Sequence, residues 1–325
     1  MSPGVTEDPP QYPTHPRKAR TTMSATRNER LGWLGTGRMG TVMSESLLAG
    51  GADLTVWNRT AAKTKPLVDK GAKAVPAITG LSDADIVFVM VSASQDLIDV
   101  VTGEGGLLSA DKTPSVIVDC STVSAEASSE VRAACQAAGV DFLASPISGN
   151  PHMVADGMGA IVASGPRETY DRVLPYLQLI APTVVHAGPE EQSRLVKICH
   201  NLMLGMITQA LVEVTTLAEK GGVPRGAFID FLNGSVLGST FIKHKGRALV
   251  ERDYTPTFNN KMLRKDFDLG LGAARHLEVP MPVSSMVHQL IQTAIGHGFA
   301  EEDYAALFEV EARAAGMRSG DDSTR

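Results

Sequence analysis

Short apolar runs alternate with longer amphipathic segments between residues 31 and 192 of the chain. The runs are rich in Val, Ile and Leu, which favours buried β-strands, and polar, Ala-rich stretches of helical length separate several of them. Strands separated by such spacers predict β-α-β units, and hence an α/β fold with a doubly wound parallel sheet. The expected strands are residues 31–34, 54–57, 86–91, 115–119, 142–143 and 160–163.

The strand pattern stops near residue 192, and only helical periodicity follows. Expected helices are residues 194–219, 224–232, 258–277, 283–295 and 304–315. We therefore expect an α/β domain over residues 31–192 and an all-helical domain over residues 193–317. Residues 1–30 are polar and rich in proline, which predicts a disordered tail, and Met23 within it is an alternative start.

The net charge of the chain indicates which kinds of binding partner to expect. The chain has 30 Lys and Arg against 36 Asp and Glu, a net charge of −6, and no dense basic stripe. This excludes nucleic acid and anionic membrane as expected partners and favours a small metabolite. The sequence shows no signal-peptide pattern, so we expect a cytoplasmic protein. Its three cysteines, Cys120, Cys135 and Cys199, are widely spaced, which predicts neither a disulfide framework nor a metal site.

A glycine motif follows the first expected strand and opens the first helix. Residues 35–40 read Gly-Thr-Gly-Arg-Met-Gly. In a GxGxxG turn the first glycine permits a tight bend, the second lets a pyrophosphate approach the backbone, and the third lets helix and strand pack closely. The motif predicts a Rossmann-type dinucleotide-binding domain. The cofactor-binding residues expected here and at the end of the 86–91 strand are Gly35, Thr36, Gly37, Arg38, Met39, Gly40, Met90 and Val91.

The end of the second strand bears on the choice of cofactor. About 20 residues past the glycines, an NAD site places a carboxylate for the ribose 2′-hydroxyl, which would repel a 2′-phosphate. Here Asn58, Arg59 and Thr60 occupy this position. An arginine can hold a phosphate through charge-assisted hydrogen bonds. We therefore expect the protein to prefer NADP(H) over NAD(H), with these three residues at the adenosine end of the site.

One expected helix carries polar residues on an apolar background. Lys197, His200 and Asn201 lie at positions i, i+3 and i+4 of the 194–204 segment, so they share one face of the helix. A buried polar group needs a partner or a wet cavity. Burial lowers the pKa of a lysine into the range that suits proton transfer. The segment therefore predicts a general acid/base at Lys197, assisted by its two neighbours.

These motifs come in the order seen in the β-hydroxyacid dehydrogenase family, which the chain resembles from about residue 31 to residue 315. That family includes 3-hydroxyisobutyrate dehydrogenases and semialdehyde reductases. The resemblance rests on residues 35–40, on the stretches Asp-Cys-Ser-Thr at 119–122 and Ser-Pro-Ile-Ser-Gly-Asn at 145–150, on the lysine helix, and on Leu-Arg-Lys-Asp at 263–266.

The resemblance implies roles for matching residues. Lys197 resembles the family's catalytic lysine, and Asn201 matches the asparagine that helps to position the substrate. Ser148 and Gly149 match the loop that anchors the substrate carboxylate, and hydroxyl and backbone N–H donors beyond the end of a strand suit an anion. On the cofactor side, Thr122 matches a residue beside the nicotinamide ribose. Finally, Lys265 matches a lysine that reaches over the cofactor.

The chain departs from the family pattern at several positions. Asn150 stands where the family has a second glycine, so we expect its side chain to intrude on the substrate position. Ser193 replaces a glycine. His200 produces a pattern similar to 6-phosphogluconate dehydrogenase, but that enzyme's second acid, a glutamate, would fall at Leu204. Decarboxylation of a phosphosugar is therefore disfavoured.

We expect an NADP(H)-dependent oxidoreductase that interconverts a small anionic β-hydroxyacid and its semialdehyde or keto form. Two alternatives stay open. One is an imine reductase-like enzyme, although that group carries Asp or Tyr at the lysine position. The other is a catalytically silent, cofactor-binding interaction protein. The Ala- and Leu-rich helical domain predicts a homodimer or homotetramer.

Overall fold

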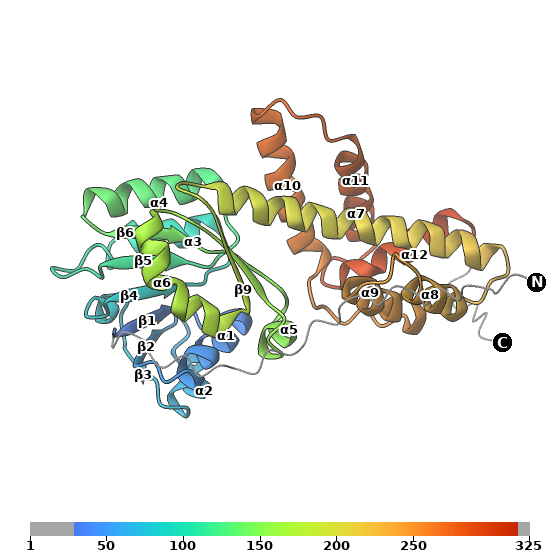
Figure 1. The fold of residues 1–325 in the computed structure, drawn as a ribbon. Helices are drawn as coiled ribbons and strands as arrows, with labels where there is room; N and C mark the ends of the chain where they lie inside the picture. Colours follow the sequence, from blue (N-terminus) through green and yellow to red (C-terminus); the bar gives the residue numbers. More distant parts are fainter. Residues whose placement is uncertain (1–28, 318–325) are drawn as a thin grey trace, which may run out of the picture.

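Two lobes joined by one long helix make up the computed structural model, which describes residues 29–317 (Figure 1). The first lobe is built on a nine-stranded sheet with the order β3-β2-β1-β4-β5-β6-β8-β7, and β9 pairs with β8. The strands are β1 (Leu31–Leu34), β2 (Leu54–Trp57), β3 (Lys73–Ala74), β4 (Ile86–Val89), β5 (Val116–Asp119), β6 (Asp141–Ala144), β7 (Ile147–Ser148), β8 (Ala160–Ser164) and β9 (Thr183–Gly188).

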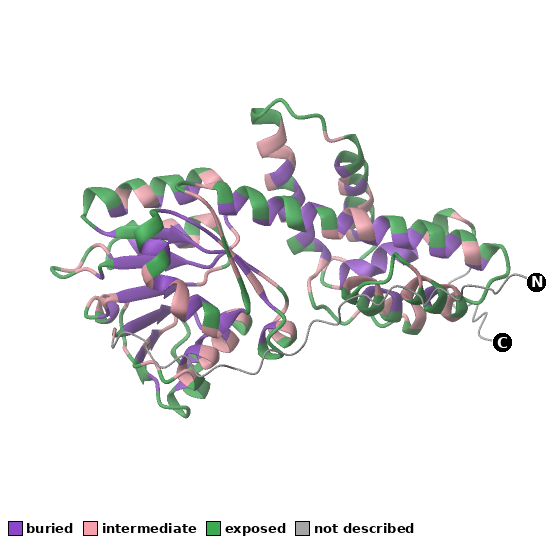
Figure 2. Ribbon diagram, viewed as in Figure 1, coloured by how far each residue is buried: buried purple, intermediate pink, exposed green. Residues whose placement is uncertain are grey.

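The predicted doubly wound parallel sheet is confirmed over its central part. The six neighbouring strands β3-β2-β1-β4-β5-β6 all pair in parallel, whereas β8 runs antiparallel to β6 and β7. Strands β3, β7 and β9 were not predicted: β3 and β7 have two residues each, too short for a periodic signal, and β9 is largely solvent-accessible. Because β1, β4 and β5 are buried on both faces, they appear in the sequence as continuous apolar runs (Figure 2).

Helices cover both faces of the sheet and enclose two apolar cores. Helices α1, α2, α5 and α6 close one core, in which Trp33 stacks on Phe88 with ring centroids 5.5 Å apart, and α3 and α4 close the other. The helices of this lobe are α1 (Arg38–Ala49), α2 (Lys65–Val68), α3 (Ser94–Thr102), α4 (Ala125–Ala137), α5 (Pro151–Ala155) and α6 (Arg167–Ile180), with 3-10 turns η1 (Ala61–Thr64) and η2 (Ile78–Leu81).

Helix α7 (Gln192–Lys220) leaves the sheet lobe and forms the axis of the helical lobe (Figure 1). Helix α9 was not predicted, because only three of its residues are buried and charged residues interrupt its apolar stripe. Around α7 lie α8 (Arg225–Gly234), α9 (Thr240–Glu251), α10 (Asn260–His276), α11 (Pro282–Gly296), the 3-10 turn η3 (Tyr304–Ala306) and α12 (Leu307–Ala314).

Within residues 29–317, α7 is the one helix that is long and apolar enough to cross a membrane, judged by length and composition alone. Half of that apolar stretch is buried inside the protein. Its buried side includes Ile198, Leu202 and Leu211, which belong to the core of the helical lobe. The apolar residues on the buried side of α7 are therefore explained by packing in the core of the helical lobe.

The start of the described chain is attached to the sheet lobe. Glu29 pairs with Arg172, and Arg30 pairs with Asp85. The other residues of the predicted disordered tail, 1–28, and the alternative start at Met23 lie outside the described residues.

Candidate active site

The glycine turn between β1 and α1 has the geometry of a phosphate cradle. Gly35 has φ +97°, and a Cβ there would lie 2.1 Å from the carbonyl oxygen of Met90. A Cβ on Gly40 would lie 1.9 Å from the oxygen of Gly35, so these two glycines are required by close approach. By contrast, a Cβ on Gly37 would meet nothing within 4 Å among the described residues. The backbone at Gly37 therefore borders open space at the start of α1.

The same turn carries polar groups without partners in the described part of the chain. The hydroxyl oxygen of Thr36 is buried and has no hydrogen-bond partner there. No side chain of residues 29–317 caps the N-terminus of α1, so its first N–H groups are available. A helix N-terminus with free N–H groups beside open space suits a pyrophosphate. The residues present therefore fit a dinucleotide cofactor.

Asn58 supports this turn from the end of β2. Its Oδ1 accepts a hydrogen bond from the backbone N–H of Thr36 at 2.9 Å, and its Nδ2 donates to the Thr60 carbonyl at 3.0 Å. The side chain of Arg59, in contrast, is 87% exposed, and its guanidinium lies 3.7 Å from Asp96. Asn58 is thus committed to shaping the turn, whereas Arg59 is available to an incoming anion.

A chain of hydrogen bonds links the polar face of α7 to the sheet lobe and to α10. Asn201 Nδ2 donates to the buried Asp266 carboxylate at 2.6 Å, which turns the amide oxygen toward α7's other polar groups. That oxygen accepts from Lys197 Nζ at 3.0 Å and lies 3.0 Å from His200 Nδ1. An amide oxygen can only accept, so Nδ1 carries a proton. His200 Nε2 then lies 3.0 Å from the Ser148 hydroxyl at the end of β7.

Burial sets the protonation behaviour of this cluster. Lys197 is 8% exposed, and its pKa is lowered to about 8 by desolvation; Asp266 opposes the shift and Lys265 adds to it. Desolvation also raises the pKa of the buried Asp266 and lowers that of His200, which lies at the more exposed edge of the cluster. A lysine with a pKa near 8 can both give and take a proton close to neutral pH. The arrangement therefore suits proton transfer at a carbonyl or hydroxyl oxygen.

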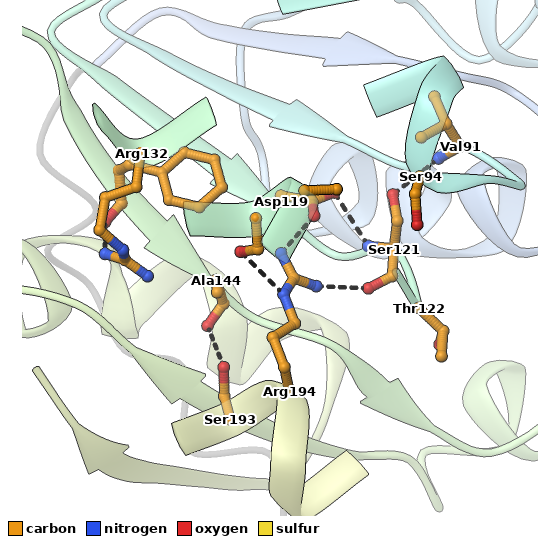
Figure 3. Close-up of polar contacts among 12 residues, drawn as sticks. Val91, Ser94, Asp119, Ser121, Thr122, Arg132, Ala144, Ser193 and Arg194 are labelled. Atoms are coloured by element: carbon orange, nitrogen blue, oxygen red, sulfur yellow. Dashed lines mark hydrogen bonds and ion pairs between the residues drawn. The ribbon is translucent and has the colours of Figure 1, made fainter. Parts of the chain in front are cut away.

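The loop after β5 meets the end of β4 and α10. Lys265 Nζ donates to the Thr122 carbonyl at 3.0 Å, and the backbone N–H of Val91 donates to the Ser121 hydroxyl at 2.9 Å. The preceding residue, Met90, pairs with Leu34 of β1. These hydrogen bonds bring the predicted residues Met90, Val91, Thr122 and Lys265 into one connected region next to β1, the strand that precedes the glycine turn. Val91, Ser121 and Thr122 are drawn in Figure 3.

The loop after β7, where the substrate carboxylate is predicted to bind, contains Gly149 and a helix-capping residue. Gly149 has φ +126°, a conformation that favours glycine. Asn150, however, is the N-cap of α5, and its side-chain oxygen accepts from the backbone N–H of Met153 at 2.9 Å. This hydrogen bond uses the side-chain oxygen of Asn150 to cap α5. It is not a contact toward the predicted substrate position. A role for Asn150 in substrate binding stays a prediction.

Asp266 belongs to this cluster but was not predicted as a site residue from the sequence. It was noted only as the last residue of the Leu-Arg-Lys-Asp motif at 263–266. The available signal was a charged residue on the apolar face of α10, next to the buried Leu263 and Phe267. A buried carboxylate demands a partner, and its partner lies 65 positions away in the sequence.

The fold and the site define an NAD(P)-binding oxidoreductase, and comparisons with known proteins agree. A family model described as the NAD binding domain of 6-phosphogluconate dehydrogenase matches residues 30–188. A second, described as the NAD-binding domain of NADP-dependent 3-hydroxyisobutyrate dehydrogenase, matches residues 192–310. The chain belongs to the 3-hydroxyisobutyrate dehydrogenase-type family, and its dehydrogenase and semialdehyde reductase relatives indicate a dehydrogenase acting on CH–OH groups.

Three similar proteins illustrate the relationship. Glyoxylate/succinic semialdehyde reductase 2 of Arabidopsis thaliana is 27% identical over 89% of this chain and 82% of its own length. An uncharacterized oxidoreductase of Bacillus subtilis is 31% identical over 85% of this chain and 97% of its own length. The crystal structure of a 3-hydroxyisobutyrate dehydrogenase from Salmonella typhimurium superposes with a TM-score of 0.78 at 25% identity, covering 87% of this chain and 99% of that one.

Proposed function

We propose that this protein is an NADP(H)-dependent enzyme that interconverts a small β-hydroxyacid and its semialdehyde or keto form. The observation that carries the proposal is the buried Lys197, whose ammonium is held by Asn201 and whose pKa lies near 8. The relatives support the substrate class, since one is a glyoxylate/succinic semialdehyde reductase and the solved structure is a 3-hydroxyisobutyrate dehydrogenase.

The protein side chains divide the work of the reaction. The residues at 35–40 would hold the dinucleotide, which when bound would supply or accept the hydride. In the reductive direction Lys197 gives its proton to the substrate oxygen, and in the oxidative direction it removes that proton. Asn201 orients Lys197, and the hydroxyl of Ser148 with the N–H of Gly149 anchors the substrate carboxylate. His200, 3.0 Å from Ser148, orients that hydroxyl.

The preference for NADP(H) rests on the end of β2. No carboxylate occupies position 58, where an NAD site would use one for the ribose. Arg59 is exposed, and so are Arg38 at the start of α1 and Lys63 in η1. Exposed cations near the expected adenosine end of the site are available to pair with the 2′-phosphate.

A self-association of the helical lobe belongs to the same proposal. Large apolar side chains are exposed on α7, α8 and α11 and on the loop after α8, including Leu217, Phe231, Val236, Leu237 and Met286. Exposed apolar residues gathered on one lobe mark an interaction surface. We expect a homodimer or homotetramer in solution, measured as the molar mass of the eluting protein by light scattering, and a mass equal to one chain would refute it.

A substrate screen tests the proposed activity. Purified protein is supplied with NADPH or NADH and a panel of semialdehydes, keto acids, β-hydroxyacids and cyclic imines, and NAD(P)H absorbance is followed. Turnover of a small semialdehyde with NADPH, lost in Lys197→Met and kept in a matched surface variant, Lys112→Met, supports the proposal. Turnover of imines alone favours an imine reductase, and NADPH binding without any turnover favours an interaction protein.

A further inference from the structure

The first turn of α7 is attached to two loops of the sheet lobe by adjacent residues (Figure 3). The Ser193 hydroxyl donates to the Ala144 carbonyl at 3.1 Å, at the end of β6 and just before the substrate loop. Arg194 follows, and it is 1% exposed. A guanidinium carries a permanent charge, so its burial requires a full set of acceptors.

Each of the three nitrogen atoms of the Arg194 guanidinium has an acceptor in the sheet lobe. Nε donates to the Ser128 hydroxyl at 3.1 Å, and one terminal nitrogen donates to the Ser121 carbonyl at 2.6 Å. The other terminal nitrogen forms an ion pair with Asp119, which is fully buried at the end of β5. The other carboxylate oxygen of Asp119 accepts from the Ser121 N–H at 3.0 Å. Asp119 and Arg194 thus hold the backbone of Ser121 from both sides.

The held backbone is the loop that carries the predicted nicotinamide contact. Consecutive carbonyls of this loop accept from two helices of the other lobe: Ser121 from Arg194 of α7, and Thr122 from Lys265 of α10. Lys197 follows Arg194 by three positions on α7, so the two side chains leave the same side of the helix. The loop and the lysine are therefore connected through a single turn of helix.

We propose that Arg194 is a positioning residue for the reaction: its ion pair with Asp119 and its bond to Ser121 fix the distance between Lys197 and the loop at 121–122. This inference rests on the proposed function of Lys197. The cofactor cradle at residues 35–40 makes none of these bonds, so loss of the Arg194 contacts disturbs the placement of the lysine and leaves the pyrophosphate contacts in place. The expected signature is a loss in kcat with little change in NADPH affinity.

The test replaces the ion pair by a neutral pair, Arg194→Gln with Asp119→Asn, in which the shorter glutamine removes the guanidinium contacts and no unpaired charge is left in the interior. The matched control is Arg132→Met, because Arg132 also ties the start of α7 to the sheet lobe, through Glu190 and Glu191, but does not touch residues 119–122. A displacement on the order of 1 Å lowers catalysis about 100-fold. We expect kcat of the neutral pair to fall roughly 30- to 100-fold, with an NADPH Kd within about threefold of wild type.

Three further measurements decide the matter. Wild-type kcat in the folded neutral-pair variant, or an equal loss of kcat in Arg132→Met, overturns the proposal. If the neutral-pair variant does not fold, Arg194→Lys replaces it, since lysine keeps the charge but lacks the planar fork. A loss of kcat with retained NADPH affinity in this variant supports the positioning role, and an unchanged kcat overturns the proposal.

Amide hydrogen exchange of the peptide spanning residues 119–124 gives a measurement that is independent of turnover. Faster exchange in the Arg194 variants supports the proposal that Arg194 holds this loop. Unchanged exchange refutes the proposal, even if no substrate is turned over.

Discussion

Lys197 and Arg59, two cations at opposite ends of the proposed site, differ in burial and in their polar contacts. Lys197 is 8% exposed, and its ammonium donates to Asn201 within a cluster that also contains Asp266 and His200. The side chain of Arg59 is 87% exposed, and its ionic contact with Asp96 is 3.7 Å long.

The difference separates proton chemistry from affinity. The interior controls the pKa of Lys197, because desolvation disfavours the ammonium and is the main cause that lowers this pKa to about 8. Arg59 lies in solvent, so that residue can contribute attraction for an anion and nothing more. Variants at the buried cation should therefore change kcat, whereas variants at the exposed one should change cofactor affinity.

The largest effect is expected from Lys197→Met, which keeps the apolar stem and removes the ammonium. Loss of a general acid/base lowers kcat by about 10²- to 10⁴-fold. The NADPH Kd should be unchanged, because the ammonium of Lys197 is hydrogen-bonded to Asn201 on its own helix and not to the cofactor cradle at residues 35–40. Steady-state kinetics and NADPH fluorescence titration measure the two quantities. A variant that keeps more than a tenth of wild-type kcat would contradict the assignment.

The next effect is on the pH profile. In the reductive direction Lys197 must be protonated, so kcat should fall about tenfold per pH unit above a pKa of about 8. In the oxidative direction the neutral amine is required, so kcat should rise through the same pH range and level off above it. Asp266→Asn removes a carboxylate that raises the pKa of Lys197, and the transition should move to lower pH. A profile that is flat between pH 7 and pH 9 in both directions would argue against this role.

A smaller effect is expected at the exposed cation. Arg59→Ala should lower kcat/KM for NADPH by about 10- to 100-fold, since a hydrogen bond to a charged group contributes about 1.5–3 kcal/mol. The value for NADH should stay unchanged, because NADH has no 2′-phosphate. Arg167→Ala, an exposed arginine on α6, is the matched control. Equal losses with both cofactors would show that Arg59 does not select between them.

The smallest effect tests the partner of Arg59. Asp96→Asn keeps the oxygen that accepts from the Ala93 N–H at the start of α3, but removes the charge that faces Arg59. Exposed ion pairs contribute about 0.2–1 kcal/mol, so NADPH should bind roughly 1.5- to 5-fold more tightly. Isothermal titration of the variant with NADPH measures this shift. Weaker binding would mean that Asp96 supports the site instead of competing with the phosphate.

Much of this protein could be inferred from neighbouring residues alone. The buried strands β1, β4 and β5, the glycine turn and the shared face of Lys197, His200 and Asn201 all follow from spacing within one element. Helix periodicity brings positions i, i+3 and i+4 together whatever the rest of the chain does. Local order therefore sufficed for the central strands of the sheet lobe, for the cofactor class and for the candidate lysine.

Contacts between distant positions needed the folded chain. Ser148 and His200 are 52 positions apart, Asn201 and Asp266 are 65 apart, and Asp119 and Arg194 are 75 apart. No periodicity relates such positions, because their distance depends on how strands and helices from different parts of the chain pack. The contact between Asn201 and Asp266 forms only in the folded chain. The burial that lowers the pKa of Lys197 likewise arises only when the rest of the protein packs around α7.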